Sequence, residues 1–112
     1  MKLSVLERVL LGGMMSNYQG TFVNLKLIRE GREALSFNEE ETKALVFVQT
    51  DNRMTWNPVA SITYQAVDIT LGAEVTKIIK ELLQKFNDEA KLTEQHFSLY
   101  EKFMEPNLKL VQ

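Results

Sequence analysis

Cysteine is absent from the 112-residue chain, and histidine occurs once, as His96. Disulfide bonds are therefore excluded, and so are the common zinc sites, which combine several cysteine and histidine ligands within one chain. The acidic run "NEEE" also lacks the alternating oxygen ligands of a calcium loop. A chain of this length buries a hydrophobic core without covalent cross-links. We expect a protein of a reducing compartment, the cytoplasm, that holds no metal and no cofactor.

Long hydrophobic runs are missing as well. Residues 1–13 are largely apolar, but Glu7 and Arg8 interrupt them, and no small-residue cleavage site follows. No uninterrupted run approaches the roughly 18 apolar residues of a membrane-spanning helix. The sequence therefore predicts a soluble protein without a signal peptide and without membrane contact.

Neither sign of charge is in large excess. Thirteen basic side chains oppose fifteen acidic ones, which gives a net charge of -2. Nonspecific nucleic-acid binding usually requires a clear basic excess, so this balance argues against a nucleic-acid partner, although a local basic patch stays open. The apolar share of 45% is typical of a globular protein. We predict one compact domain over residues 1–112, with residues 105–112 as a C-terminal tail.

Capping residues predict where the first helices begin. Ser4 and Glu7 have the spacing of a capping box, in which a hydroxyl and a carboxylate each accept a free backbone amide. We expect this helix to run to about Leu11 and to end at Gly12 or Gly13, because glycine readily adopts the left-handed conformation that ends helices.

A second helix is predicted to start at Thr21. Phe22, Leu25 and Ile28 follow at helical spacing and would share one face. Gly31 weakens the end of this helix without breaking it, because glycine costs only about 1 kcal/mol relative to alanine.

A third, short helix is predicted from Ser36 and Glu39, which repeat the capping pattern. Glu39, Glu40 and Glu41 would lie in its first turn, where the helix dipole favours negative charge. Ser36 would therefore mark the start of this helix.

The middle of the chain has strand character. The runs "VFVQT" at 46–50 and "RMTWN" at 53–57 are separated by the turn-forming pair Asp-Asn at 51 and 52, which predicts a β-hairpin. Pro58 would end the second strand. A third strand is plausible over residues 62–69, where "ITYQAVDI" continues the pattern.

The clearest helix of the sequence is predicted over residues 71–90, where apolar residues form one stripe and lysines and glutamates lie opposite. The stripe consists of Leu71, Val75, Ile78, Ile79, Leu82 and Phe86. A last helix would be capped by Thr93 and end at the Glu-Pro pair at 105 and 106. Its inward residues would be Phe97, Tyr100, Phe103 and Met104. The predicted fold is α+β and mainly helical, with four to five helices and a small central antiparallel β-hairpin or three-stranded sheet.

The glycines at 12, 13 and 20 raise the question of a phosphate-binding loop. The nucleotide-hydrolase loop requires Gly-x-x-x-x-Gly-Lys-Ser/Thr after a strand, whereas here the glycines follow a helix and Gly20 precedes Thr21. The favoured interpretation is a helix-to-helix turn. The alternative is an anion at the free amides after Thr21, with Tyr18 stacking on a base and Asn24 adding a polar contact.

Lys26, Arg29 and Arg32 recur every three residues and would share one side of the second helix. Such a stripe suits a phosphate or an acidic partner. Glu30 and Glu33 follow Lys26 and Arg29 by four residues and would neutralise much of the charge. A solvated, salt-bridged face is therefore the favoured interpretation.

Trp56 is the single tryptophan. Strand alternation places Met54 and Trp56 on one face and Arg53, Thr55 and Asn57 on the other. The favoured interpretation is that Trp56 anchors the sheet onto the helices. The alternative is a role in an interface or in ligand stacking, since tryptophan and arginine are enriched in binding hot spots.

No catalytic constellation is recognisable. Ser4 and Ser36 are explained as helix caps, and the Gly-x-Ser-x-Gly elbow of hydrolases is absent. His96 falls at the third position after the Thr93 cap, where a polar side chain is expected. We therefore predict that the protein is not an enzyme.

Several segments together resemble a family of small uncharacterised proteins encoded by bacteriophages and prophages of Gram-positive bacteria. The segments are "SVLERVLL", "GTFVNLKLIREGREALSFNEEE", the Trp56–Asn57 pair and "KLTEQHFSLYEKF". The resemblance covers roughly residues 1–104 and involves no catalytic motif. It implies a phage protein in the host cytoplasm, and it assigns no role to any residue.

The leading functional hypothesis is a non-enzymatic phage accessory protein that acts by binding and counters host defence. A small anionic nucleotide would use Tyr18, the helix start at Thr21, and the guanidinium groups of Arg29, Arg32 and Arg53. A host protein would instead use the acidic helix start and the hairpin. The alternative from another class is a structural or DNA-metabolism component of the phage that assembles through its helices. A homo-oligomer is expected, because a small sheet edge and Trp56 offer surface for self-association.

Overall fold

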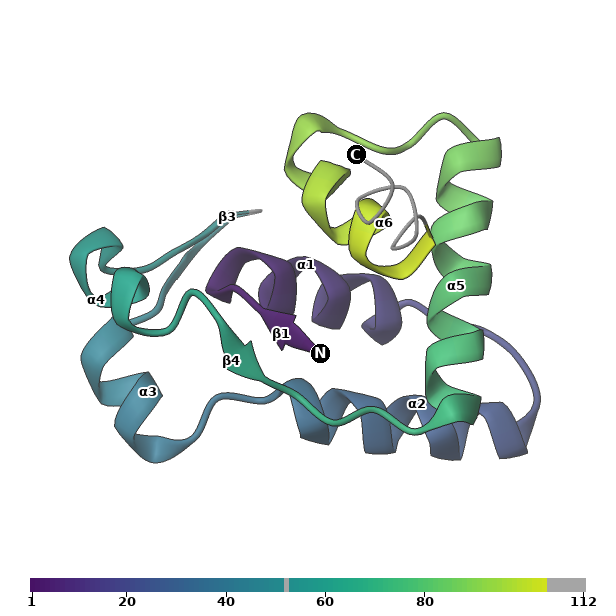
Figure 1. Ribbon diagram of the computed structural model, residues 1–112, viewed down its shortest axis with the longest axis horizontal. Coiled ribbons are helices and arrows are strands. Elements are labelled where there is room, and N and C mark those ends of the chain that lie inside the picture. The colour runs from purple at the N-terminus through teal and green to yellow at the C-terminus, as the bar shows by residue number, and fades with distance from the viewer. Residues whose placement is uncertain (52, 105–112) are drawn as a thin grey trace, which may run out of the picture.

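A computed structural model describes residues 1–51 and 53–104 (Figure 1). The elements in chain order are β1 (Lys2–Leu3), α1 (Val5–Ser16), α2 (Phe22–Leu35), α3 (Glu39–Leu45), β2 (Val48–Thr50), β3 (Arg53–Thr55), α4 (Pro58–Thr63), β4 (Val67–Asp68), α5 (Ala73–Asp88), the 3-10 helix η1 (Glu94–His96) and α6 (Phe97–Met104). The prediction of a mainly helical α+β fold is confirmed, with six α-helices among the described residues where four to five were expected.

The start of α1 is the predicted capping box. The Glu7 amide donates to Ser4 Oγ at 3.1 Å, and the Ser4 amide donates to Glu7 Oε1 at 2.8 Å. The predicted end near Leu11 is wrong, because α1 continues through both glycines to Ser16. Met14 and Met15, one turn further, are buried in the core, and their burial outweighs the modest helical cost of glycine.

The second helix starts at its predicted cap, where Thr21 Oγ1 accepts the Asn24 amide at 3.2 Å. Of the three residues predicted to share one face, Ile28 is buried in the core, whereas Phe22 is 74% and Leu25 41% exposed, so the first turn of this face lies in solvent. Gly31 lies inside α2 at a close helix contact. A Cβ atom there would lie 2.6 Å from Met15 Cε and 2.8 Å from Val75 Cγ1, so glycine lets α1 and α5 approach α2.

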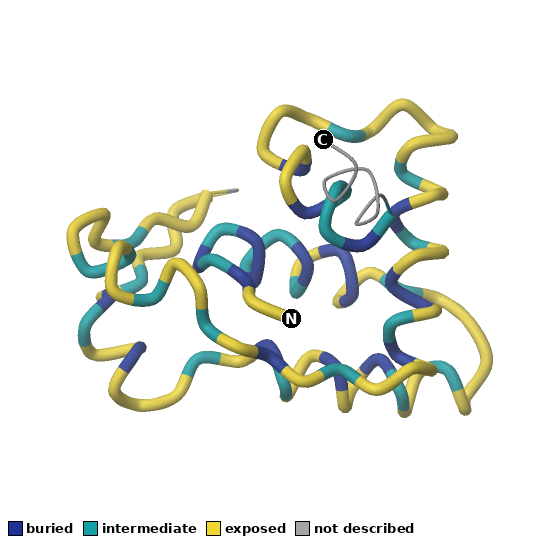
Figure 2. The backbone as a smooth tube through the Cα atoms, viewed as in Figure 1, coloured by how far each residue is buried: buried dark blue, intermediate teal, exposed yellow. Residues whose placement is uncertain are grey.

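Four helices, α1, α2, α5 and α6, enclose the main hydrophobic core (Figure 2). Together with β1, β4 and η1 we call them the helical body. The predicted stripe of α5 packs inward, with Leu83 as an additional fully buried residue. In α6, Phe103 is buried as predicted, whereas Phe97 is 61% exposed and Leu99 occupies the inward position.

A buried carboxylate also links α1 to α6. Glu7 Oε1 accepts from Lys102 Nζ at 2.6 Å, and Glu7 Oε2 accepts from the Ser98 hydroxyl at 2.8 Å. Burial by itself would raise the pKa of Glu7, but these hydrogen bonds and the Ser4 amide hold that pKa below its ordinary value. Glu7 therefore both caps α1 and holds α6 against it.

The connection from α2 to α3 corrects the predicted cap. Ser36 ends α2, and its hydroxyl donates to the Glu33 carbonyl at 2.6 Å, so it is unavailable as an N-cap. Asn38 starts α3 instead and forms a capping box with Glu41. The three glutamates lie in the first turn, as predicted.

The predicted hairpin is confirmed: β2 and β3 are antiparallel, with Gln49 opposite Met54. Asp51 has a positive φ of 43° at the turn, and the other predicted turn residue lies outside the described part of the chain. The predicted third strand over 62–69 is wrong up to residue 66: residues 62 and 63 end α4 (Pro58–Thr63), residues 64–66 form a turn, and only Val67–Asp68 is a strand. Asn57 Oδ1 caps α4, and proline suits its first turn because it lacks an amide hydrogen.

The remaining strand segment joins a different sheet. β4 pairs antiparallel with β1, placing Leu3 opposite Val67, so residues far apart in sequence lie side by side at the edge of the body. Within the described ranges, no helix combines the length and the apolar character needed to cross a membrane. The predicted C-terminal stop at 105 and 106 and the tail 105–112 lie outside these ranges.

Candidate ligand-binding groove

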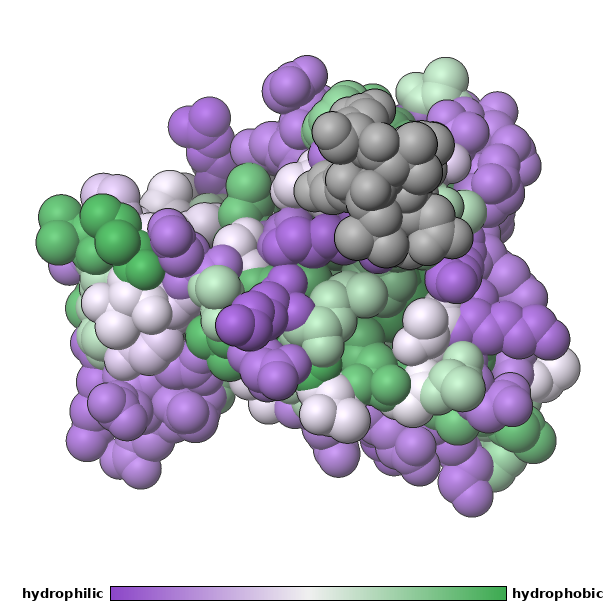
Figure 3. All heavy atoms as spheres, in the orientation of Figure 1, coloured by the Kyte–Doolittle hydropathy of each residue, from purple (hydrophilic) through white to green (hydrophobic). Residues whose placement is uncertain are grey.

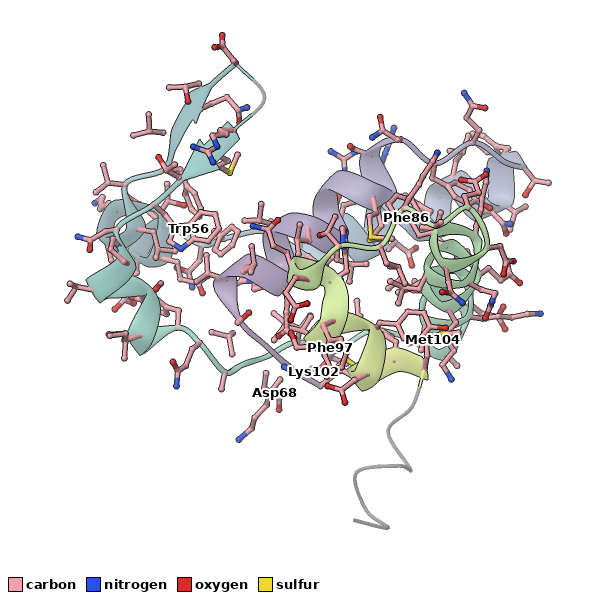
Figure 4. The ribbon with its side chains drawn as sticks, turned by 90° about the horizontal axis from the view of Figure 1, so that it is seen from above. Trp56, Asp68, Phe86, Phe97, Lys102 and Met104 are labelled. Atoms are coloured by element: carbon pink, nitrogen blue, oxygen red, sulfur yellow. The ribbon has the colours of Figure 1, made fainter. Side chains whose placement is uncertain are left out.

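A groove of about 1090 Å³ lies between α1 and the β2–β3 hairpin. In Figure 4, the labelled Trp56 lies at the base of the hairpin, between it and α1. We define the groove by its lining residues, which come from α1 on one side, from the hairpin and its flanks on the other, and from the end of α2 with the loop that follows it. They are Leu6, Arg8, Val9, Leu10, Gly12 and Gly13 of α1, Arg32, Leu35, Ser36 and Phe37 around the end of α2, and Phe47, Gln49, Arg53, Met54, Thr55 and Trp56 of the hairpin and its flanks. Gln95 of η1 completes the lining.

Three aromatic rings form one wall of the groove. The centroids of Phe37 and Phe47 are 4.8 Å apart, and those of Phe47 and Trp56 are 6.1 Å apart in an edge-to-face arrangement. Both distances are typical of favourable aromatic pairs. All three side chains are only half-buried, so they pack on each other and still line the groove.

Arg8 connects the two sides of the groove. Its Nη1 donates to Glu41 Oε2 at 2.6 Å, its Nη2 donates to the Ser36 carbonyl at 2.6 Å, and its Nε donates to the Leu35 carbonyl at 3.1 Å. The guanidinium carbon also lies 3.9 Å from the centre of the Phe37 ring. One side chain of α1 thus contacts the end of α2, the following loop and α3.

The Arg8–Glu41 ion pair is buried, with side-chain exposures of 1% and 6%. Burial by itself would raise the pKa of Glu41, but the hydrogen bonds from Arg8 and from the Asn38 amide hold that pKa below its ordinary value. Sequence reasoning missed this pair. The available signals were an arginine within an apolar helical stretch and a glutamate at the third position after a cap.

Two further guanidinium groups line the groove without a counter-charge. Arg32 from α2 and Arg53 from β3 are both exposed. Among the ion pairs of residues 1–51 and 53–104, none includes either arginine, and the predicted salt bridges of the basic stripe do not form. The described lining contains no aspartate or glutamate, so the groove is positively charged.

The other candidates lie elsewhere. Tyr18, Thr21 and Asn24 form a cluster at the α1–α2 turn, where Asn24 Nδ2 donates to Tyr18 Oη at 3.0 Å. Their polar groups largely satisfy one another. Arg29 is exposed on α2 and lines no part of the groove. Of the seven candidates, the structure brings together Arg32, Arg53 and Trp56.

His96 has a structural environment. Its Nδ1 accepts the Thr93 amide at 3.0 Å, and its ring lies 6.0 Å from that of Phe86. Burial lowers the pKa of His96, which favours the neutral ring that can accept this hydrogen bond. His96 does not line the groove.

The groove offers binding contacts but no recognisable acid–base pair. Its described lining contains no carboxylate, histidine, lysine or cysteine, and the Ser36 hydroxyl is engaged with the Glu33 carbonyl. In the described part of the chain, no three histidine, cysteine, aspartate or glutamate residues are grouped to hold a metal ion. A scan of family models, a search of curated proteins and a search of solved structures each found no match to this chain. The function is therefore argued from the chemistry of the groove.

Proposed function

We propose that the protein is a non-catalytic binding protein and that it holds a small anionic molecule in the groove. One observation carries the proposal: Arg32 and Arg53 line the same groove as the Phe37–Phe47–Trp56 wall, and no acidic side chain of the described lining opposes them. Guanidinium groups present paired donors that match phosphate and carboxylate oxygens.

The biological part of the proposal follows from the resemblance to phage proteins. An accessory protein without catalytic groups acts by occupying a molecule of the host, and a positively charged groove suits a small anionic signal. Sequestering such a signal in the host cytoplasm would counter a defence pathway that depends on it. Compared with blocking a host protein, this role makes direct use of the concave lining and its two uncompensated arginines.

The test uses the small-molecule fraction of a bacterial extract, freed of proteins. We expect this fraction to raise the melting temperature of the protein, because a ligand that binds only the folded state stabilises it by mass action. The double variant Arg32→Gln/Arg53→Gln should lose the rise. Arg29→Gln removes a neighbouring exposed arginine of α2 outside the groove and is the matched control. An unchanged melting temperature, or an equal rise in the double variant, would refute the proposal.

A further inference from the structure

We infer that the ligand is a nucleotide carrying at least two phosphate charges, an inference that rests on the proposed function. Its base would lie against the Trp56 and Phe47 rings, and its phosphates would contact Arg32 and Arg53. The inference depends on three features of the groove: its aromatic wall, the separate origin of its two cations, and an open stretch of α1 backbone.

The aromatic wall selects for a flat ring. Phe47 and Trp56 pack edge to face, and both line the groove as half-buried side chains, so each has surface available to a ligand. A purine or pyrimidine gains stacking energy on such a surface whatever its identity, because every base has a π-face. An aliphatic carboxylic acid or a sugar phosphate lacks this ring and leaves the wall unused.

The two cations select for more than one negative group. Arg32 comes from α2 and Arg53 from the first residue of β3, so they reach the groove from different elements. A ligand with two phosphate charges can contact both arginines while α2 and β3 stay in place. Gln49, Thr55 and Gln95 add uncharged polar groups suited to ribose hydroxyls and base edges.

The groove is also large and open along α1. Its volume of about 1090 Å³ slightly exceeds the roughly 300–1,000 Å³ of small-molecule sites, so a nucleotide fits within it. A Cβ atom at Gly12 or Gly13 would meet nothing within 4 Å outside the helix itself, so the two glycines leave free space in the groove. This space gives a physical reason for glycine inside a helix that it weakens, because a ligand can approach the backbone there.

Trp56 provides a direct reporter, because it is the only tryptophan of the chain. We would titrate the full chain with ADP and cyclic di-AMP and follow tryptophan fluorescence, with adenosine and inorganic pyrophosphate as matched probes. At least one nucleotide should quench the fluorescence and bind about tenfold more tightly than pyrophosphate, because stacking adds to charge. Adenosine should also bind at least about tenfold more weakly, because it offers no charge to the arginines.

Variants locate the ligand, with affinity measured by calorimetry and the fold checked by circular dichroism. Arg32→Gln and Arg53→Gln should each weaken nucleotide binding about tenfold, and Arg29→Gln should leave it unchanged. Trp56→Phe keeps an aromatic ring and should retain most of the affinity that Trp56→Leu loses. If Trp56→Leu fails to fold, the comparison of nucleotide with pyrophosphate still decides the point.

Two outcomes separate the inference from the proposal beneath it. If pyrophosphate binds as tightly as either nucleotide and depends on both arginines, the nucleotide inference is overturned while an anion-binding groove stands. If neither the nucleotides nor pyrophosphate bind and the cell extract gives no stabilisation, both are overturned.

Discussion

The helical body and the segment that carries the hairpin are held together by different forces. The body has a continuous core of apolar side chains from four helices. The segment with α3, β2, β3 and α4, which we call the hairpin module, has two short strands whose described residues are all exposed, and its one fully buried apolar residue is Leu45. Its strongest visible link to the body is the Arg8–Glu41 ion pair. Hydrophobic burial stabilises the body, whereas the Arg8–Glu41 ion pair and the Phe37–Phe47 ring contact link the module to it.

This difference suits a binding groove. The apolar core keeps α1 and α2 rigid, and thus fixes one side. The hairpin and the residues that flank it contribute Phe47, Trp56 and Arg53 from a thin element with little core of its own. Elements with few buried contacts open at low free-energy cost, so the hairpin side of the groove is expected to adapt to a ligand.

The largest effect is expected from Arg8→Met, which removes the cation and leaves the Glu41 carboxylate buried. Breaking a buried pair in this way should lower the free energy of unfolding by about 3–5 kcal/mol, measured by urea denaturation. Adding Glu41→Gln should recover part of the loss. Lys43→Met breaks the exposed Glu39–Lys43 pair and should change stability by less than about 0.5 kcal/mol. If Arg8→Met costs no more than Lys43→Met, the hairpin module is not held by this contact.

The next effect compares one substitution at two glycines. Gly31→Ala places a Cβ atom 2.6 Å from Met15 Cε and 2.8 Å from Val75 Cγ1, and this overpacking should destabilise the protein by about 1–3 kcal/mol. Gly12→Ala meets open space and should stabilise α1 by about 0.5–1 kcal/mol. Thermal or urea unfolding distinguishes them. If both substitutions changed the free energy of unfolding in the same direction, the packing around Gly31 would be more adaptable than its contacts indicate.

A smaller effect concerns pH. Because burial lowers the pKa of His96, the unfolded chain binds more protons between that lowered value and the ordinary value of about 6.5. The free energy of unfolding should therefore fall as the pH drops below about 6.5. His96→Asn, whose side-chain oxygen can accept the Thr93 amide, should remove this slope. If His96→Asn showed the same dependence of unfolding free energy on pH as the wild type, in urea titrations at pH 7, 6 and 5, the slope would not come from His96.

Glu7 and Glu41 act in a separate, more acidic range. Their lowered pKa values mean that their stabilisation is complete above the ordinary glutamate value of about 4.3 and is lost as the pH falls through the lowered values. Acid unfolding should therefore persist in His96→Asn. In Glu41→Gln, the loss of unfolding free energy between pH 7 and the acidic range should be smaller than in the wild type.

The smallest effect on stability is expected from surface changes in the hairpin module. Val48 and Met54 are exposed on the hairpin, and Figure 3 shows apolar surface over α4, where Val59 and Ile62 are exposed. Val48→Lys should change unfolding by less than about 0.5 kcal/mol. If the hairpin edges pair between two copies, Val48→Lys should also convert a concentration-dependent dimer to monomer, measured by analytical ultracentrifugation. A wild-type chain that sediments as a monomer at all concentrations would contradict self-association.

Sequence reasoning succeeded where structure depends on near neighbours. The caps at Ser4 and Thr21 are hydrogen bonds that close within three residues, so their residue types were sufficient to identify them. It failed at Gly12 and Gly13, because what continues α1 is the burial of the following methionines against other helices. It failed at residues 62–66 of the predicted third strand for a related reason: Asn57 caps α4 and Pro58 begins it, and the β-branched composition concealed this helix and the turn that follows it.

The candidate site shows the same division. Arg32, Arg53 and Trp56 could be selected by residue type, because arginine and tryptophan are enriched in binding hot spots. Their separation from Tyr18, Thr21 and Arg29 could not, since they belong to α2 and to the hairpin, which meet only in the folded chain. Arg8 was read as a charge that interrupts an apolar run, and its role became visible only through its four hydrogen bonds.

By itself, the amino-acid sequence determined the helical class of the protein, the starts of its first two helices and the absence of disulfides and ordinary zinc sites. These properties follow from composition and from hydrogen bonds between residues a few positions apart. Only the tertiary structure decided that α1 passes through its glycines, that Arg8 holds the hairpin module, and that two arginines and an aromatic wall share one groove. Each of these depends on burial and charge pairing between segments distant in sequence, and such energies exist only once the chain has folded.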